Sequence, residues 1–161
     1  MNVLIIGSGA REHAFCWSLN KSNKVKKIYV APGNAGTVKI AKNLNIDVLN
    51  FEELKNTIIN CSVNLVVVGP EIPLIEGVVD FINNDSELNS VLVVGPSKAG
   101  AMLEGSKDFS KEFMLKHNIP TAKYKSFNQK SLSKGLDYLD LVHPPYVLKA
   151  DGPAAGKGVL I

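Results

Sequence analysis

The chain has 161 residues, of which 45% are apolar and 20% charged. This composition can bury a core, so it excludes a wholly disordered chain. No apolar run reaches the ~18 residues of a membrane span, and no basic segment precedes the first apolar run, so we expect neither a membrane nor a secreted protein. Cys16 and Cys61 lack metal-ligand spacing and are expected to be buried thiols in a reducing cytoplasm.

The net charge of +3 is concentrated at one end of the chain. Residues 1–100 contain nine basic and nine acidic side chains, whereas residues 101–161 contain nine lysines and six acids. A surplus this small is only a weak sign of nucleic-acid binding, and no basic run is interleaved with aromatic residues. It fits a site for a small anion such as a nucleotide phosphate.

Short β-branched runs alternate with helical patterns over the first hundred residues. The predicted strands are residues 3–6, 27–30, 65–68 and 91–94, and the predicted helices are residues 12–20, 51–59 and 74–82. This order favours an α/β fold, an open, doubly wound, Rossmann-like parallel sheet, as a first domain over residues 1–100. Ligands of such sheets bind at the carboxyl ends of the strands. That rule selects the loops at residues 7–12, 31–36, 69–73 and 95–98.

The pattern changes after Gly100, and residues 101–161 are predicted to start a second domain. We expect helices at residues 106–117 and 129–141, and strands at residues 122–127 and 145–150. A glycine-rich segment at residues 151–158 follows, and another strand begins at Val159.

The turn after the first strand reads Gly7-Ser8-Gly9-Ala10-Arg11-Glu12. A dinucleotide fingerprint needs a third glycine, where this chain has Glu12, and the second strand ends without the acid that holds a ribose hydroxyl. We therefore do not expect NAD. Two interpretations stay open: a turn that lets a ligand approach backbone N–H groups at a helix start, and a tight turn without a ligand.

Glu71 stands between Pro70 and Pro73 after the third strand. A carboxylate held this rigidly can accept hydrogen bonds from sugar hydroxyls or an amine. The alternative is an acid that only stabilises the start of a helix through the helix dipole.

The segment from Asp151 to Gly158 is the candidate phosphate loop, but it is not a Walker A loop. Three residues separate Gly152 from Gly156, where that motif has four, and Gly158 takes the place of the Ser or Thr that binds magnesium. The alternative is a glycine-rich flap between two antiparallel strands, which closes over phosphates with its N–H groups and Lys157. Lys149 is expected on a mostly buried strand, where a lysine is uncommon without an anion.

Lys107 precedes a predicted helix and is the third lysine of this set. Each of the three lysines, taken alone, can also be a solvated surface residue.

Taken together, these motifs resemble the phosphoribosylamine–glycine ligase family, also called glycinamide ribonucleotide synthetase, an ATP-grasp ligase of de novo purine synthesis. The resemblance covers the whole chain in order. Ala10 stands where the family usually has a further glycine, and Pro153 where it usually has Leu. The motifs are Val3-Leu4-Ile5-Ile6-Gly7-Ser8-Gly9-Ala10-Arg11-Glu12-His13-Ala14, Ala31-Pro32-Gly33-Asn34, Gly69-Pro70-Glu71-Ile72-Pro73-Leu74, Leu103-Glu104-Gly105-Ser106-Lys107 and residues 147–159.

The resemblance implies a pre-ATP-grasp domain followed by the first, incomplete part of an ATP-grasp α+β fold. It also implies a cytoplasmic enzyme that joins glycine to 5-phosphoribosylamine with ATP through glycyl phosphate, without a covalent protein nucleophile. Substrate-binding residues carried over from the family are Gly7, Gly9, Ala10, Arg11, Pro32, Gly33, Asn34 and Glu71. Residues carried over for the ATP phosphates are Lys107, Lys149, Gly152, Ala154, Ala155, Gly156, Lys157 and Gly158.

The family continues well beyond residue 161, and the implied Mg²⁺ or Mn²⁺ ligands lie in that later part. One hypothesis is therefore an N-terminal portion of the ligase that is inactive alone. The other is a stand-alone small-ligand-binding module, or an inactive remnant that keeps the substrate pocket. An incomplete second domain also predicts self-association through its exposed edge.

Overall fold

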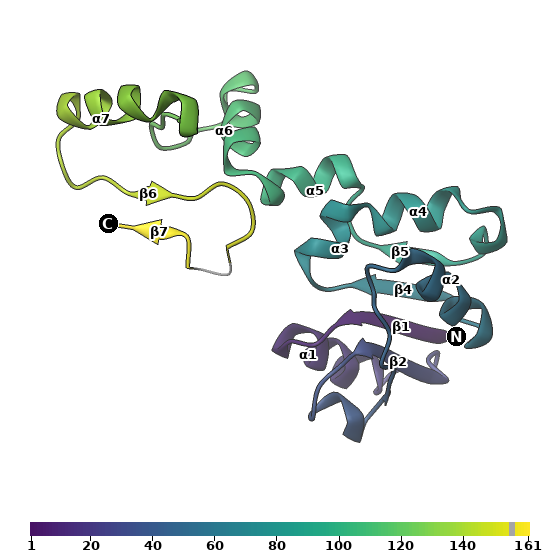
Figure 1. Ribbon diagram of the computed structural model, residues 1–161. Coiled ribbons are helices and arrows are strands. Elements are labelled where there is room, and N and C mark those ends of the chain that lie inside the picture. The colour runs from purple at the N-terminus through teal and green to yellow at the C-terminus, as the bar shows by residue number, and fades with distance from the viewer. Residues whose placement is uncertain (155–156) are drawn as a thin grey trace. The chain divides into compact units, whose positions relative to one another are not determined.

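A computed structural model describes residues 1–154 and 157–161. The chain forms two compact units, unit 1 (Met1–Ala101) and unit 2 (Met102–Ile161), which are treated separately below (Figure 1). In the part of the chain that the structure describes, no helix combines the length and the hydropathy that crossing a bilayer requires.

Unit 1 is built on a five-stranded sheet in which every paired strand is parallel, in the order β3-β2-β1-β4-β5. This confirms the predicted fold class and all four predicted strands. The sequence did not predict β3, because two residues carry no periodicity. The strands are β1 (Asn2–Gly7), β2 (Lys27–Pro32), β3 (Lys42–Asn43), β4 (Leu65–Val68) and β5 (Leu92–Val94).

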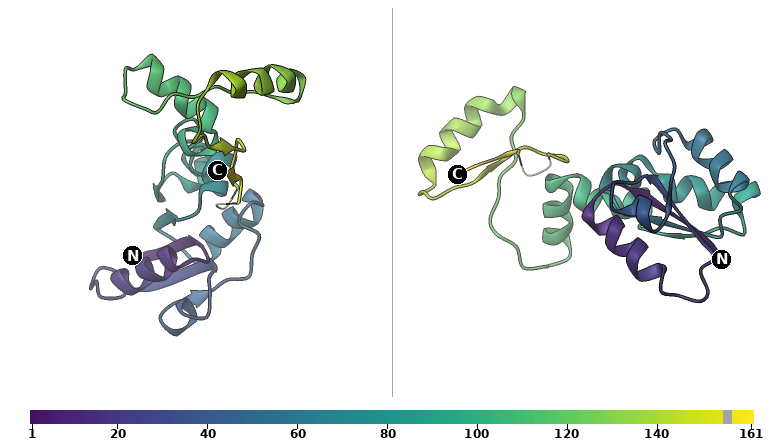
Figure 2. Two further views of the ribbon diagram at one scale, coloured as in Figure 1. Left: turned by 90° about the vertical axis from the view of Figure 1, so that its left-hand side faces the viewer. Right: turned by 90° about the horizontal axis from the view of Figure 1, so that it is seen from below.

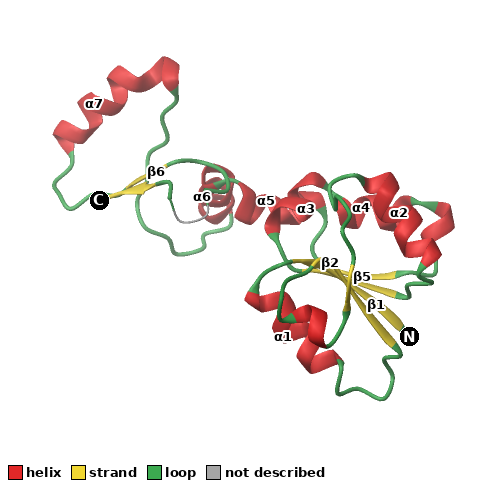
Figure 3. Ribbon diagram, turned by 60° about the horizontal axis from the view of Figure 1, so that its bottom comes forward, coloured by secondary structure: helices red, strands yellow, loops and turns green. Residues whose placement is uncertain are grey.

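Helices cover both faces of this sheet (Figure 3). Successive strand residues point to opposite faces. Val3 and Ile5 therefore pack with Cys16 of α1 (Ala10–Leu19), whereas Leu4 and Ile6 belong to a second cluster on the other face. That second cluster includes side chains from α2 (Phe51–Asn60), α3 (Glu71–Glu76) and α4 (Val78–Asn84). Because both faces are buried, the strands are continuous apolar runs.

The predicted helix at residues 74–82 is two helices in the structure. Gly77 has φ +99° and separates α3 from α4, a left-handed conformation that glycine adopts without strain. Another helix, α5 (Lys98–Gly105), was not predicted, and its Ala101 is buried in the core of unit 1. Cys16 is buried as expected, but Cys61 is only partly buried. Short 3₁₀ turns lie at Thr37–Lys39, Ser86–Leu88 and Gln129–Ser131.

Unit 2 contains α6 (Lys107–Lys116), α7 (Leu132–Leu141) and two short antiparallel strands, β6 (Leu148–Lys149) and β7 (Val159–Leu160). Figure 2 shows β6 and β7, in yellow, as a narrow hairpin. This confirms the predicted antiparallel pair that flanks the glycine-rich segment.

The predicted strand at residues 122–127 is wrong, since the structure has no strand there. The segment has no neighbouring strand among the described residues to receive its hydrogen bonds. Instead, Lys111 Nζ donates to the carbonyl of Ala122 at 2.9 Å, and the ring of Phe127 packs beside Tyr138 of α7.

Unit 2 has no core of its own among its described residues. Every buried apolar side chain of the described residues lies at or before Ala101. Leu136 and Leu141 of α7 are 59% and 78% exposed, and Leu160 of β7 is 70% exposed. Unit 1 is thus a domain whose sheet is covered by helices on both faces, whereas the β6–β7 hairpin and α7 leave their apolar side chains exposed.

The two units should differ in the stability of their backbone hydrogen bonds. Amides of β1 lie in a core that is fully buried, so they should exchange with solvent only through large-scale unfolding. Amides of β6 and β7 should exchange at least about a hundredfold faster, since little buried apolar surface protects them. Hydrogen–deuterium exchange read by mass spectrometry on the 161-residue chain measures this, and equal protection of β1 and β6 in a monomer contradicts it.

Candidate functional site

Four loops lie at the carboxyl edge of the sheet in unit 1. Ile6 at the end of β1 is paired with Ala31 of β2 on one side and with Val68 of β4 on the other. The amide of Gly33 donates to the carbonyl of Gly7 at 3.1 Å, and that of Gly69 to Ile6 at 3.0 Å. From β1 the chain continues to β2 on one side of β1, and it later adds β4 on the other side of β1. The switch point, where doubly wound sheets bind ligands, therefore lies between β1 and β4.

Glu12 fills the space under the turn at this switch point. The residue is only 4% exposed, and its Oε2 accepts a hydrogen bond of 2.5 Å from the amide of Gly9, the residue that caps α1. A Cβ added to Gly69 would stand 1.9 Å from Glu12 Oε1, and one added to Gly7 would stand 2.7 Å from the Glu12 carboxyl carbon. The glycines are therefore needed to make room for a carboxylate of the chain itself.

Arg11 and Glu71 belong to the loops that follow β1 and β4, the two strands on either side of the switch point. Arg11 Nη1 donates to the carbonyl of Gly69 at 2.8 Å, so the start of α1 is attached to the end of β4. Glu71, partly buried, is the first residue of α3 and follows two residues after Gly69. Ala10 is the first, exposed residue of α1. These predicted substrate residues thus belong to the two loops that flank the switch point.

The side chain of Asn34 is fully engaged within the chain. Its Nδ2 donates to the carbonyls of Ser8 and Gly9 at 2.9 and 3.1 Å, and its Oδ1 accepts from the amides of Gly36 and Thr37. All the donors and acceptors of the amide group are in use. Asn34 therefore fixes the loop after β2 to the turn after β1. Pro32 ends β2, and Gly33 is hydrogen-bonded to Gly7, so both lie at the same edge.

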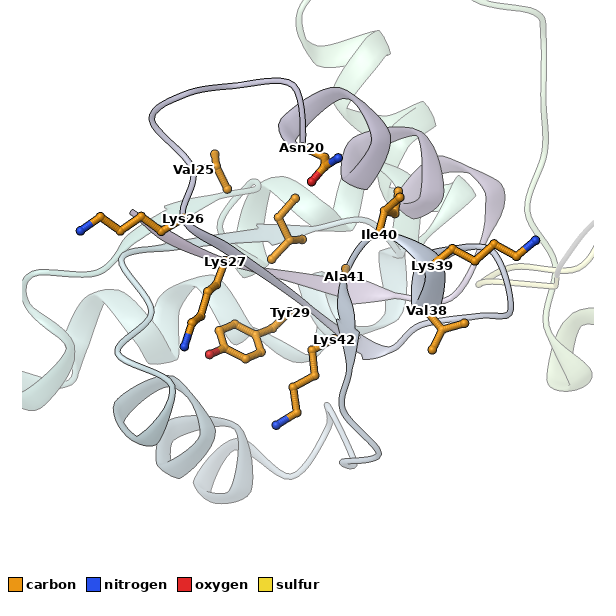
Figure 4. Close-up of a pocket in the computed structure, with 11 residues that line it drawn as sticks. Asn20, Val25, Lys26, Lys27, Tyr29, Val38, Lys39, Ile40, Ala41 and Lys42 are labelled. Atoms are coloured by element: carbon orange, nitrogen blue, oxygen red, sulfur yellow. The ribbon is translucent and has the colours of Figure 1, made fainter.

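A pocket of about 650 Å³ elsewhere on unit 1 is not the candidate site (Figure 4). It lies along the outer edge of β2 and beside β3, away from the loops that follow β1 and β4, and its lining includes Lys26, Lys27, Lys39 and Lys42. Because β3 pairs with β2 at only two positions, the first part of β2 has an open edge. Lysines are a common means of protecting such an edge from pairing with another chain.

In unit 2, Asp151 caps the first turn of α6. Its Oδ1 accepts from the amide of Lys107 at 2.6 Å, and its Oδ2 accepts from the hydroxyl of Ser106 at 3.0 Å. Ser106 is itself the N-cap of α6 and accepts from the amide of Phe109. Desolvation alone would raise the pKa of Asp151, but hydrogen bonds from Ser106 and from backbone N–H groups outweigh it and lower the pKa. No local pattern indicated this contact, which joins residues 44 or 45 positions apart.

Lys107 reaches the glycine-rich segment directly. Its Nζ donates to the carbonyl of Gly152 at 2.7 Å. Lys107 and the beginning of the predicted flap are therefore brought together, and the contact between Asp151 and α6 holds both in place.

The structure corrects the expectation for Lys149. The residue is exposed on the two-residue strand β6 and is not on a mostly buried strand, because no described element covers that strand pair. Lys157 is also exposed, and its amide donates to the carbonyl of Ala154 at 2.8 Å. Gly158 accepts from the amide of Ala150 at 2.8 Å, which closes the hairpin. Ala155 and Gly156 lie outside the described residues.

Among residues 1–154 and 157–161, no group of three or more His, Cys, Asp or Glu side chains is arranged to hold a metal ion.

Two protein-family models together match the whole chain. The family model described as phosphoribosylglycinamide synthetase, N domain, matches residues 1–104. The model described as phosphoribosylglycinamide synthetase, ATP-grasp (A) domain, matches residues 105–161.

Curated relatives are similar over the full chain. Phosphoribosylamine–glycine ligases of Pseudomonas syringae pv. tomato and Clostridium acetobutylicum are 48% and 47% identical to it, and each alignment covers 100% of this chain. The crystal structure of phosphoribosylamine–glycine ligase from Thermotoga maritima matches 99% of the chain with a TM-score of 0.70 and 33% identity. The chain spans 36% and 37% of those two relatives and 35% of the Thermotoga chain. From its first residue to its last, the chain belongs to the phosphoribosylglycinamide synthetase family.

Proposed function

We propose that this chain provides the first part of an ATP-dependent ligase that joins glycine to 5-phosphoribosylamine and gives glycinamide ribonucleotide. The observation that carries this proposal is the unbroken family match, with an N domain followed directly by an ATP-grasp domain. The 33% identity to the Thermotoga ligase over 99% of the chain supports the same activity.

The reaction has two steps. The carboxylate of glycine attacks the terminal phosphorus of ATP, which forms glycyl phosphate and releases ADP. The amine of phosphoribosylamine then attacks the carbonyl carbon of glycyl phosphate, phosphate leaves, and the amine proton is lost to solvent. Neither step needs a covalent bond to the protein, so the task of the protein is positioning and stabilisation of negative charge.

Unit 1 is proposed to bind phosphoribosylamine at the switch point between β1 and β4. The carboxylate of Glu71 supplies a hydrogen-bonding group at this edge, whereas Gly7, Gly9 and Gly33 are proposed to shape the turn, since the Gly33 amide donates to Gly7 and the Gly9 amide to Glu12. Arg11 and Asn34 are proposed to act mainly by shaping the turn, since their polar groups already bind Gly69, Ser8 and Gly9. Ala10 and Pro32 have no polar side-chain group, so they contribute only their backbone and their apolar surface to the proposed site.

Unit 2 is proposed to hold the phosphates of ATP. Lys107, Lys149 and Lys157 bring three positive charges to the hairpin formed by β6 and β7, and the N–H groups of the segment from Gly152 to Gly158 complete the phosphate site. Magnesium, when bound to ATP, neutralises phosphate charge. No described residues of this chain are assigned as its ligands.

A second candidate function is a small-ligand-binding module without turnover. The observation that favours it is the closed, two-faced core of unit 1, in contrast to unit 2, none of whose described apolar side chains is buried. In this alternative, the exposed leucines of α7 and β7 lead the chain to associate with itself. A test of turnover separates the two functions.

A chimeric enzyme tests the ligase directly. Residues 1–161 should replace the aligned, 48% identical segment of the Pseudomonas syringae ligase. The chimera should release phosphate only when ATP, glycine and phosphoribosylamine are all present. The reason is that the exchanged part keeps the residues proposed to position phosphoribosylamine and the phosphates of ATP. A coupled assay for phosphate measures this. The 161-residue chain alone, with no acidic metal site among its described residues, is the matched control and should not exceed a heat-inactivated sample. A chimera that folds and binds ATP but shows no turnover supports the binding module instead.

Lys107 should matter more than another lysine of the same helix. In the chimera, Lys107→Ala should lower kcat/KM for ATP by about one to two decades, because a charge-assisted hydrogen bond contributes ~1.5–3 kcal/mol and each decade corresponds to ~1.4 kcal/mol.

Lys116→Ala is the matched control for this measurement. Lys116 is the last residue of α6 and is exposed. Its replacement by alanine removes the same positive charge as Lys107→Ala. Its kcat/KM should stay within about twofold of the unmodified chimera. Equal losses of kcat/KM in the two variants would show that only the net charge of α6 contributes, and not the position of Lys107.

A further inference from the structure

We propose that Glu12 determines which part of the ligand unit 1 binds at its switch point: a hydroxyl or amine group that donates a hydrogen bond, and not a phosphate. This inference rests on the proposed function and names a recognition element for it. It concerns a residue that was noticed in the sequence only because it replaces a glycine.

The first observation is that the start of α1 is already occupied. Glycine-rich turns at helix starts bind phosphate because free N–H groups and the helix dipole favour an anion. Here the amide of Gly9 donates to Glu12 Oε2 at 2.5 Å, so the chain supplies its own anion. A phosphate at this point would have to displace a carboxylate that is 4% exposed and would also be repelled by its charge.

The second observation concerns the other oxygen of the same carboxylate. No described residue donates a hydrogen bond to Glu12 Oε1, whose neighbour is the backbone of Gly69. Yet no fully buried side-chain oxygen of the described residues lacks a partner. Oε1 is therefore not fully buried and has no partner among the described residues, so it is free to accept a hydrogen bond from a ligand.

The third observation is that the charge of Glu12 is not paired within the described part of the chain. The ion pairs found there involve Lys55 with Asp85 and Glu87. The neighbouring Arg11 directs its Nη1 to the carbonyl of Gly69. A carboxylate without a cation next to it attracts a donor ligand, such as the amine or a hydroxyl of a ribosylamine, and the 5-phosphate of that ligand must bind elsewhere.

Binding of glycinamide ribonucleotide to the 161-residue chain, measured by calorimetry, tests this role. Glu12→Gln keeps the shape of the side chain and can still accept from Gly9, but it removes the charge and turns one acceptor into a donor. Affinity should fall about 10–100-fold, the range expected when a charged hydrogen bond is lost. Glu76→Gln, the same change at the exposed end of α3, should leave affinity within about twofold. Thermal unfolding of both variants checks that the fold is kept.

The outcomes separate this inference from the proposed function. If the unmodified chain and Glu76→Gln bind but Glu12→Gln binds as tightly, the role of Glu12 is wrong while the proposed function stands. If the unmodified chain does not bind the ribonucleotide at all, the substrate site proposed for unit 1 is wrong.

Amide NMR of the unmodified chain needs no variant and decides the case even if Glu12→Gln fails to fold. The ribonucleotide should shift the Gly9 and Gly69 resonances, whereas inorganic phosphate at the same concentration should leave them unchanged. A shift of Gly9 with inorganic phosphate would overturn the inference.

Discussion

A single buried carboxylate organises the carboxyl edge of the sheet in unit 1. Glu12 lies where a larger residue at Gly7, Gly9 or Gly69 would collide with it, so the ends of β1 and β4 and the start of α1 share one constraint. Charged groups are rarely buried unless they are hydrogen-bonded. The Gly9 amide supplies that bond, and the topology of the parallel sheet brings Gly69 to the opposite side of the same carboxylate.

Unit 2 uses the same principle at a different helix. Asp151 places a carboxylate on the first amides of α6, as Glu12 does on the start of α1. In both places an acid from the chain satisfies N–H groups that a helix start leaves free. The consequences differ. In unit 1 the acid comes from the helix itself and fixes a turn, whereas in unit 2 it comes from a segment distant in sequence and brings the flap to Lys107.

The sequence predicts those features that depend on local periodicity. Buried strands such as β1 and β4 are continuous apolar runs, and the missing third glycine argued against a dinucleotide fingerprint. Features that depend on distant contacts were missed. The pattern did not indicate that Asp151 caps α6, nor that the side-chain amide of Asn34, a predicted substrate residue, is saturated by bonds within the chain.

Two further errors have the same origin. Residues 122–127 have the composition of a strand but no neighbouring strand among the described residues, and Lys149 was expected on a buried strand that nothing described covers. Secondary structure of this kind depends on tertiary partners more than on propensity.

A double-mutant cycle between Glu12 and Gly69 tests most directly whether one carboxylate sets this constraint. Gly69 does not have the positive φ that would itself exclude alanine, and the three atoms nearest to an added Cβ all belong to the Glu12 side chain. Gly69→Ala should lower the free energy of unfolding by about 2–3 kcal/mol through overpacking. In a Glu12→Ala background the same change should cost less than about 0.5 kcal/mol, which gives a coupling energy of about 2 kcal/mol. Additive effects within about 0.5 kcal/mol would contradict the central role of Glu12.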